Sequence, residues 1–306
     1  MIPFAQRAQE MGLDVSSSYK GLYSYEDRYS KVVYRELGAS QPHLDPQHHP
    51  TDGAEVPMIG VWTAPPQTNN YSYVGYVSNI YKFVGNELII DRVRNALEEV
   101  GTPILKIATH LLYDLTAIRE ETVLRSSLSS PQAGDINPVM IIGNSYNGTK
   151  AATVAFGIAV DGGEIIGQTI FGFSLGEMKM IHIASNNTRL SSGINQYLEV
   201  FNNHILDMID RSFNTILTQD QMFGTLDVIE KYGKKRRKQI TDILTSMQPP
   251  PREGQPPALP SAWQVFLSIT RYCALEPNLN MKRLLENIAE SVLVVPTRMY
   301  EVLGQL

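Results

Sequence analysis

Residues 138–173 carry the clearest structural signal in the chain, and they read PVMIIGNSYNGTKAATVAFGIAVDGGEIIGQTIFGF. Three apolar, extended runs are separated by Asn147-Gly148 and by Asp161-Gly162-Gly163, and both separators are rich in residues that favour hairpin turns. Upstream, residues 105–111 alternate with a period of two, which is typical of a strand. We therefore predict an antiparallel sheet within residues 103–185.

Helical patterns lie on both sides of this sheet. Before it, an apolar stripe that starts at the capping residue Asn86 and stops at Gly101 predicts a helix over 86–100. After it, the spacing of apolar residues predicts helices at about 195–217, 221–247, 261–274 and 280–294. Strands followed by helices predict an α+β fold, with a central antiparallel sheet and a helical C-terminal half.

The same patterns divide the chain into four regions. Short strands in 56–77 belong to the first region, and six prolines between 248 and 260 predict an extended linker or an exposed loop. The regions are a mixed N-terminal part with the antiparallel sheet (1–185), a helical part with a basic cluster (186–247), the Pro-rich linker or loop (248–260), and C-terminal helices that pack on the core (261–306).

The composition is that of a chain with enough apolar material for a packed core. Of 306 residues, 43% are hydrophobic and 19% are charged. No apolar run reaches the roughly 18 residues that a membrane span needs, and the N-terminus lacks the order of a signal peptide. The single cysteine, Cys273, leaves no disulfide framework and no cysteine-based zinc site. We expect a protein of the cytoplasm (of the host cell, if viral) that makes no contact with membranes.

A basic run in residues 231–238, KYGKKRRK, is the sharpest charge feature. The whole chain is acidic, with a net charge of −5, so binding to a polyanion requires such a local cluster. On a helix these charges repel one another, and a bound phosphate backbone would offset that cost. The alternative is a solvated helix face without a ligand. The candidate phosphate contacts are Lys231, Lys234, Lys235, Arg236, Arg237 and Lys238.

A second candidate surface combines aromatic and basic residues in segment 19–35. In proteins that bind single strands, rings stack on unpaired bases while Lys and Arg follow the phosphates. The alternative is that these tyrosines are half-buried in the opening elements of a domain. The candidates are Tyr23, Tyr25, Arg28, Tyr29, Lys31 and Arg35, to which we add Tyr146 and Lys150 on either side of the Asn147-Gly148 turn.

Motifs for catalysis and for metal binding are incomplete. Residues 143–147, GNSYN, nearly match the G-x-S-x-G nucleophile elbow, but Asn147 replaces the last glycine and a strand pattern follows where a helix is needed. No Walker loop or dinucleotide fingerprint is present. We therefore predict no catalytic residue, no metal, no cofactor and no enzymatic activity. The metal ligands that we considered and set aside, because their spacing fits no standard site, are His43, Asp45, His48, His49 and Asp52.

Three stretches carry further motifs: residues 77–101, residues 139–148 (VMIIGNSYNG) and residues 261–272 (SAWQVFLSITRY). They resemble an early entry into a helix, a strand with an NSYDGS turn, and a closing AWxLxNAxTEY helix in a broad family of phage- and plasmid-borne proteins without an assigned enzymatic activity. Asn147 stands where that family has Asp, and Arg271 stands where it has an acidic residue.

Within phages of the Schitoviridae type, the chain resembles in size and character the Drc-like single-stranded-DNA-binding transcription regulators. That resemblance implies a homo-oligomer that binds single-stranded DNA and helps a phage RNA polymerase to start on opened DNA. We therefore predict a phage-type single-stranded-DNA-binding protein that acts in viral transcription or in DNA replication or recombination. The alternative is a phage structural or assembly protein with no nucleic-acid role. A third hypothesis, a nucleic-acid enzyme, lacks a convincing pair of carboxylates.

Overall fold

The fold is α+β, as predicted, with two antiparallel sheets and helices that follow mainly in the C-terminal half. It was obtained as a computed structural model. The structure describes residues 14–15, 22–37, 58–78, 83–112, 115, 117–148, 152–161, 168–171, 177–179, 187–250 and 258–294.

The first sheet is N-terminal, and its five strands lie side by side in chain order. One face is apolar and packs into a small core that includes Tyr23, Tyr34, Val61 and Phe83. Strands in 56–77 were predicted but a separate sheet was not, because only one face of β2 and β3 is apolar and the segment as a whole is polar. The strands are β1 (Asp14–Val15), β2 (Leu22–Glu26), β3 (Lys31–Leu37), β4 (Met58–Ala64) and β5 (Ser72–Ser78).

The second sheet is the one predicted within residues 103–185. Its strands run in the order β11-β10-β9-β7-β6, with β8 paired to β9 and β12 paired to β10. Both predicted hairpins are confirmed as antiparallel pairs, and Gly148 in the first turn has a φ of 71°, which favours glycine. Strand β8 lies in the Ser-rich segment 126–131. The strands are β6 (Ile104–Leu112), β7 (Ala117–Leu124), β8 (Leu128–Ser130), β9 (Gly134–Ser145), β10 (Thr153–Asp161), β11 (Gln168–Phe171) and β12 (Glu177–Lys179).

Helices bury one face of the second sheet in the main hydrophobic core. Tyr197 of α3 stacks on Phe156 of β10 with ring centroids 4.3 Å apart, and its hydroxyl donates to the carbonyl of Gly157. Buried residues of α6, such as Trp263 and Phe266, belong to the same cluster. The helices are α2 (Asn86–Val100), α3 (Asn187–Asn214), α4 (Gln219–Glu230), α5 (Lys234–Ser246), α6 (Ala262–Leu275) and α7 (Leu279–Glu290).

A buried ion cluster joins α7 to the opposite face of this sheet. Arg119 of β7 donates to Glu121 at 2.8 Å and to Glu286 at 3.3 Å, and Lys282 pairs with Glu121 at 3.3 Å. Burial by itself would raise the pKa of Glu121, but the charges of Arg119 and Lys282 outweigh it and lower that pKa below its usual value. The cluster therefore depends on an ionised Glu121.

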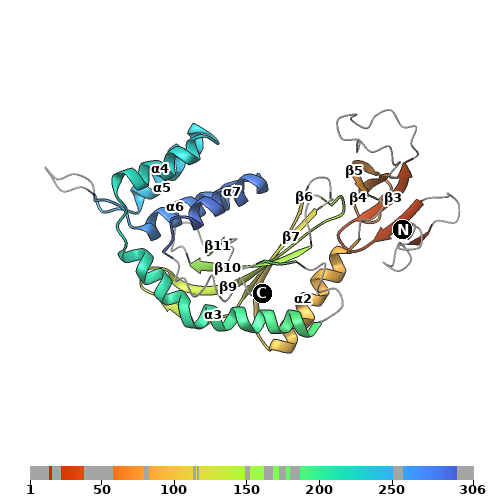
Figure 1. Ribbon diagram of the computed structural model, residues 1–306, viewed down its shortest axis with the longest axis horizontal. Helices are drawn as coiled ribbons and strands as arrows, with labels where there is room; N and C mark the ends of the chain where they lie inside the picture. The colour runs from red at the N-terminus through yellow and green to blue at the C-terminus, as the bar shows by residue number, and fades with distance from the viewer. Residues whose placement is uncertain are drawn as a thin grey trace, which may run out of the picture.

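The elements spread along one long axis (Figure 1). Helices α4 to α7 gather at one end, strands β3 to β5 lie at the other, and the second sheet with α2 and α3 connects them. In the described part of the chain, no helix combines the length and the apolarity that crossing a membrane requires.

Candidate nucleic-acid interface

The basic run lies at the junction of two helices, and the single helix predicted over 221–247 is therefore wrong. Helix α4 begins at a capping box formed by Thr218 and Gln221 and ends at Glu230. Gly233 then adopts a φ of 142°, a conformation that side chains disfavour, and α5 begins at Lys234. This glycine breaks the helix inside the basic run. We call residues 231–238 at this junction the hairpin tip.

Four lysines of the hairpin tip are exposed: Lys231, Lys234, Lys235 and Lys238. No hydrogen bond or ion pair joins any of them to another described residue. With 3.6 residues per turn, the three on α5 fall within an arc of about 100°. They form one cationic face on the first turns of the helix.

The start of α5 is electrostatically unfavourable. No acidic residue lies in its first turn, and no side chain caps it at Gly233. The helix macrodipole places partial positive charge at this end, and the lysines add to it. The local sequence therefore loses stability where it concentrates positive charge.

The two arginines of the run differ from the lysines because both have carboxylate partners. Arg236 donates through Nε to Glu276 at 2.8 Å, and Arg237 pairs with Asp227 at 2.9 Å and with Glu230. The hydrogen bond to Glu276 raises the pKa of Arg236, and that to Glu230 raises the pKa of Arg237. Arg236 therefore links α5 to the end of α6, and Arg237 links α5 to α4.

Tyr232 is a residue at this surface that sequence reasoning missed. Its side chain is 39% exposed and it lies between Lys231 and Gly233. Its place inside the basic run was the signal that could have identified it. The hairpin tip thus combines one accessible ring with four lysines that have no partner in the described part of the chain.

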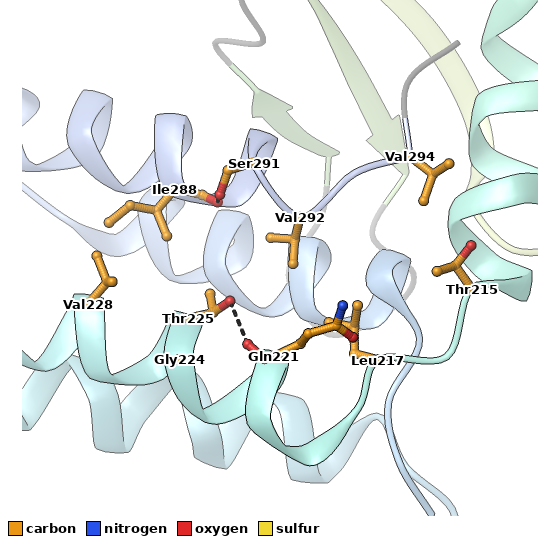
Figure 2. A pocket seen from close by; sticks show the side chains of 10 residues that line it. All are labelled: Thr215, Leu217, Gln221, Gly224, Thr225, Val228, Ile288, Ser291, Val292 and Val294. Atoms are coloured by element: carbon orange, nitrogen blue, oxygen red, sulfur yellow. Dashed lines mark hydrogen bonds between the residues drawn. The ribbon is translucent and has the colours of Figure 1, made fainter. Parts of the chain in front are cut away.

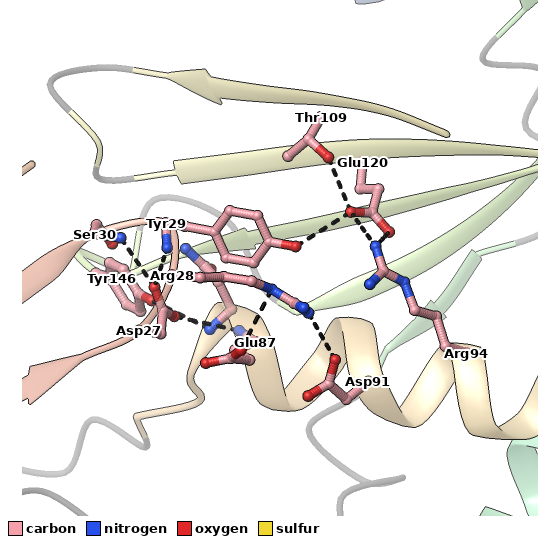
Figure 3. A network of polar contacts seen from close by, with 11 residues as sticks. Asp27, Arg28, Tyr29, Ser30, Glu87, Asp91, Arg94, Thr109, Glu120 and Tyr146 are labelled. Atoms are coloured by element: carbon pink, nitrogen blue, oxygen red, sulfur yellow. Dashed lines mark hydrogen bonds and ion pairs between the residues drawn. The ribbon is translucent and has the colours of Figure 1, made fainter. Parts of the chain in front are cut away.

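The stacking role predicted for Tyr23 and Tyr146 is wrong, because both rings are buried, with exposures of 3% and 0%. The Tyr146 hydroxyl donates to Asp27 at 2.9 Å and accepts from the backbone N–H of Asn86 at 3.2 Å (Figure 3). Burial, followed by the charge of Asp27, raises the pKa of Tyr146 well above its usual value. Tyr34, also buried, donates to the carbonyl of Tyr146 at 2.9 Å. These tyrosines join the two sheets.

Arg28 and Tyr29 belong to the neighbouring part of the same network (Figure 3). Arg28 pairs with Glu87 at 3.4 Å and Asp91 at 2.7 Å on α2, and its guanidinium lies 5.0 Å from the centre of the Tyr29 ring. The Tyr29 hydroxyl lies 3.5 Å from Glu120, a fully buried carboxylate. These side chains fasten the first sheet to α2 and β7.

The remaining candidates are scattered. Tyr25 is half-buried and its ring lies edge-on to Phe83, with centroids 4.8 Å apart. Lys31 pairs with Glu26 at 3.3 Å, and Arg35 is exposed on β3. Lys150 lies outside the described residues. The structure thus gathers the residues of the basic run at one end and leaves the N-terminal candidates at the other (Figure 1).

The nucleophile-elbow and metal-ligand motifs, both incomplete in the sequence, lie only in part within the described residues. Strand β9 ends at Ser145 and leads through a turn into β10, so the near-elbow is not followed by a helix. The histidines and aspartates of 43–52 lie outside the described residues. Among those that are described, no group of three or more potential metal ligands occurs.

An open pocket of about 490 Å³ lies between α4 and the end of α7 (Figure 2). Val228, Ile288 and Val292 contribute apolar groups, and Thr225 donates to the carbonyl of Gln221 at 3.0 Å. None of the described residues that line it is charged. The pocket therefore does not extend the cationic face of the hairpin tip.

Comparisons of the chain with protein-family models, with curated proteins and with solved structures give no match. Any function proposed for the protein therefore depends on its own residues and on the motif resemblance.

Proposed function

We propose that the protein binds single-stranded DNA, without enzymatic activity, through the hairpin tip. The observation that carries this proposal is the set of four exposed lysines without carboxylate partners among the described residues. Each can contact a phosphate and release a condensed counterion, which is the main source of affinity for nucleic acids.

The energetic cost of the hairpin tip supports a ligand for it. Lys234 and Lys238 are one helical turn apart, so they repel each other, and Lys234 and Lys235 in the first turn oppose the helix dipole. A solvated surface that served only solubility would gain nothing from this placement in a chain with a net charge of −5. A bound phosphate backbone neutralises the lysines and also interacts favourably with the helix start.

Tyr232 favours single strands over duplex as the ligand. An exposed ring among lysines can stack on a base that is unpaired, whereas the bases of a duplex are already stacked on one another. Such stacking tolerates many sequences because every base has a π-face.

The biological setting follows from the motif resemblance and is likewise part of the proposal. A protein of this kind would act in the cytoplasm of an infected cell, in phage transcription or in DNA replication or recombination, with a phage RNA polymerase as a partner. The alternative, a virion structural or assembly protein, predicts no affinity for single strands.

We also propose a homo-oligomer, and the exposed edge of β6 is the surface that fits it. Leu105, Ile107 and Leu111 are each more than 40% exposed on this nine-residue edge strand. An unprotected apolar edge is a template for pairing with another strand. If two copies pair antiparallel about Ala108, Leu105 of one copy lies opposite Leu111 of the second.

A gel shift that compares single-stranded with double-stranded DNA of equal length tests the main proposal. We expect a shift of the single strand at lower protein concentration than the duplex. A Lys234→Ala/Lys235→Ala variant should weaken the shift while its circular dichroism is unchanged. Absence of a shift with either DNA would favour the virion alternative.

A further inference from the structure

The outer face of the first sheet presents a second cluster of exposed rings, far from the hairpin tip. The register of β3, β4 and β5 places Val33, Trp62 and Tyr73 in one row across the strands. Tyr73 is 52% exposed, and its ring centroid lies 5.2 Å from that of Trp62. Residues of the opposite face, such as Val32 and Val61, are the ones in the core.

The next row contains a cation and a further ring. It consists of Arg35 on β3, Gly60 on β4 and Tyr76 on β5. Tyr76 is 38% exposed, and Arg35 is exposed without an ion pair to another described residue. Because Gly60 has no side chain, no side chain of this row separates Arg35 on β3 from Tyr76 on β5.

A bulge in β5 is the reason that both tyrosines belong to this face. Residues three apart in a regular strand point to opposite faces, so Tyr73 and Tyr76 would normally be separated. The register shifts between Val61 and Trp62, and Gly75 in the bulge has a φ of 134°, which other residues rarely adopt. Burial, followed by the nearby Tyr76, raises the pKa of Tyr73, as expected if the two hydroxyls are neighbours.

The turn between β9 and β10 holds this bulge in place. The side-chain amide of Asn147 donates to the carbonyl of Val74, inside the bulge, at 3.1 Å. An ionised aspartate has no N–H group and could not make this bond. The Asn at this position, where the resembled motif has Asp, therefore supports the arrangement of the two tyrosines.

We propose that Trp62, Tyr73, Tyr76 and Arg35 form a platform on which unpaired bases of a single-stranded nucleic acid stack. The occupant follows from the chemistry of the face: accessible rings match the π-faces of bases, and an exposed guanidinium matches a phosphate or stacks on a base. The opposite face of the sheet packs in the core, which keeps the platform rigid. Binding therefore costs little conformational entropy of the protein. The inference shares its ligand class with the proposed function, but its residues are entirely separate.

The test is a titration of a labelled oligothymidylate against the full chain and a Tyr73→Ala/Tyr76→Ala variant. Removal of two stacking rings should weaken binding at least about 10-fold without changing its salt dependence. Phe213→Ala is the matched control, because Phe213 is 39% exposed on α3, away from the platform. It should bind as the unmodified protein does.

Tryptophan emission gives an independent readout of the same site. The chain has two tryptophans, and Trp263 is only 1% exposed, so a ligand on the surface can reach Trp62 alone. We expect the oligonucleotide to quench the emission, and Trp62→Phe to abolish that quenching.

The outcomes separate this inference from the proposed function. If the Tyr73→Ala/Tyr76→Ala variant binds as tightly as Phe213→Ala does, or if no quenching occurs, the platform is refuted while the hairpin tip can still stand. If the platform variant is weakened and alanines at the hairpin lysines have no effect, the platform stands and the hairpin tip is refuted. If the unmodified protein does not bind the oligonucleotide, both fail.

Discussion

Replacing Lys231, Lys234, Lys235 and Lys238 with alanine should remove most of the salt dependence of single-strand binding. Each phosphate contact contributes about 0.7 to the slope of log affinity against log salt on single strands, so four lysines contribute about 2.8. Raising the salt from 50 to 200 mM should then weaken the unmodified protein about 50-fold through this term. Arg35, if it contacts a phosphate, adds about 0.7 that the variant retains.

The same variant should fold at least as stably as the unmodified chain. Lysines in the first turn of α5 oppose the macrodipole, and relieving one such exposed charge is worth about 0.3–1 kcal/mol at low salt. We therefore expect an equal or higher melting temperature by circular dichroism. Loss of affinity together with retained or increased stability would indicate a binding surface rather than a structural element.

Replacing Arg236 and Arg237 with alanine is the matched control within the same basic run. These side chains pair with Glu276 and with Asp227 and Glu230, so their removal should lower the melting temperature and leave most of the salt slope intact. Fluorescence anisotropy of a labelled oligothymidylate at four or more salt concentrations measures all three proteins. An unchanged affinity and slope in the folded lysine variant would refute the role of the hairpin tip.

Three further perturbations follow from the described contacts. Tyr146→Phe removes the buried donor to Asp27 and should cost about 1–3 kcal/mol of unfolding free energy in urea titrations, whereas an unchanged value would show that the hydrogen bond adds no net stability. Burial would raise the pKa of Glu121, but neighbouring cations hold it below its usual value of 4.5. Ionised Glu121 therefore stabilises the fold above pH 4.5, and this stabilisation is lost as the pH falls through the lowered pKa. Glu121→Gln should therefore show a smaller loss of stability on acidification, and an identical acid profile would contradict this. Ala108→Cys should crosslink two copies under mild oxidation if β6 edges pair, since Cys273 is buried and unreactive, and a purely monomeric product would refute that pairing.

Local patterns were sufficient to predict the second sheet and most helices. The hairpin at Asn147-Gly148 and the helix that ends at Gly101 depend on residues within a few positions, whose turn and capping preferences act without the rest of the chain. The break between α4 and α5 was also local, but the basic run hid it, because a charge cluster around Gly233 was interpreted as helix surface.

Burial of the tyrosines could not be predicted locally. Tyr146 and Tyr73 both stand near turns and among polar residues, yet one is fully buried and the other is 52% exposed. The difference arises from the docking of β9 against the first sheet and from the bulge at Gly75, which depend on contacts between segments some 70 residues apart. Two of the stacking candidates chosen by composition, Tyr23 and Tyr146, are therefore buried.

The sequence by itself determined where positive charge concentrates, because charge is a property of residue type. Only the tertiary structure decided which of those charges are free. Arg236 meets Glu276, forty positions along the chain, while Lys234 and Lys235 on the other side of α5 meet no carboxylate of the described residues. The physical reason is that an ion pair requires two groups within a few ångströms, and that proximity is set by how α4, α5 and α6 pack rather than by their order in the sequence.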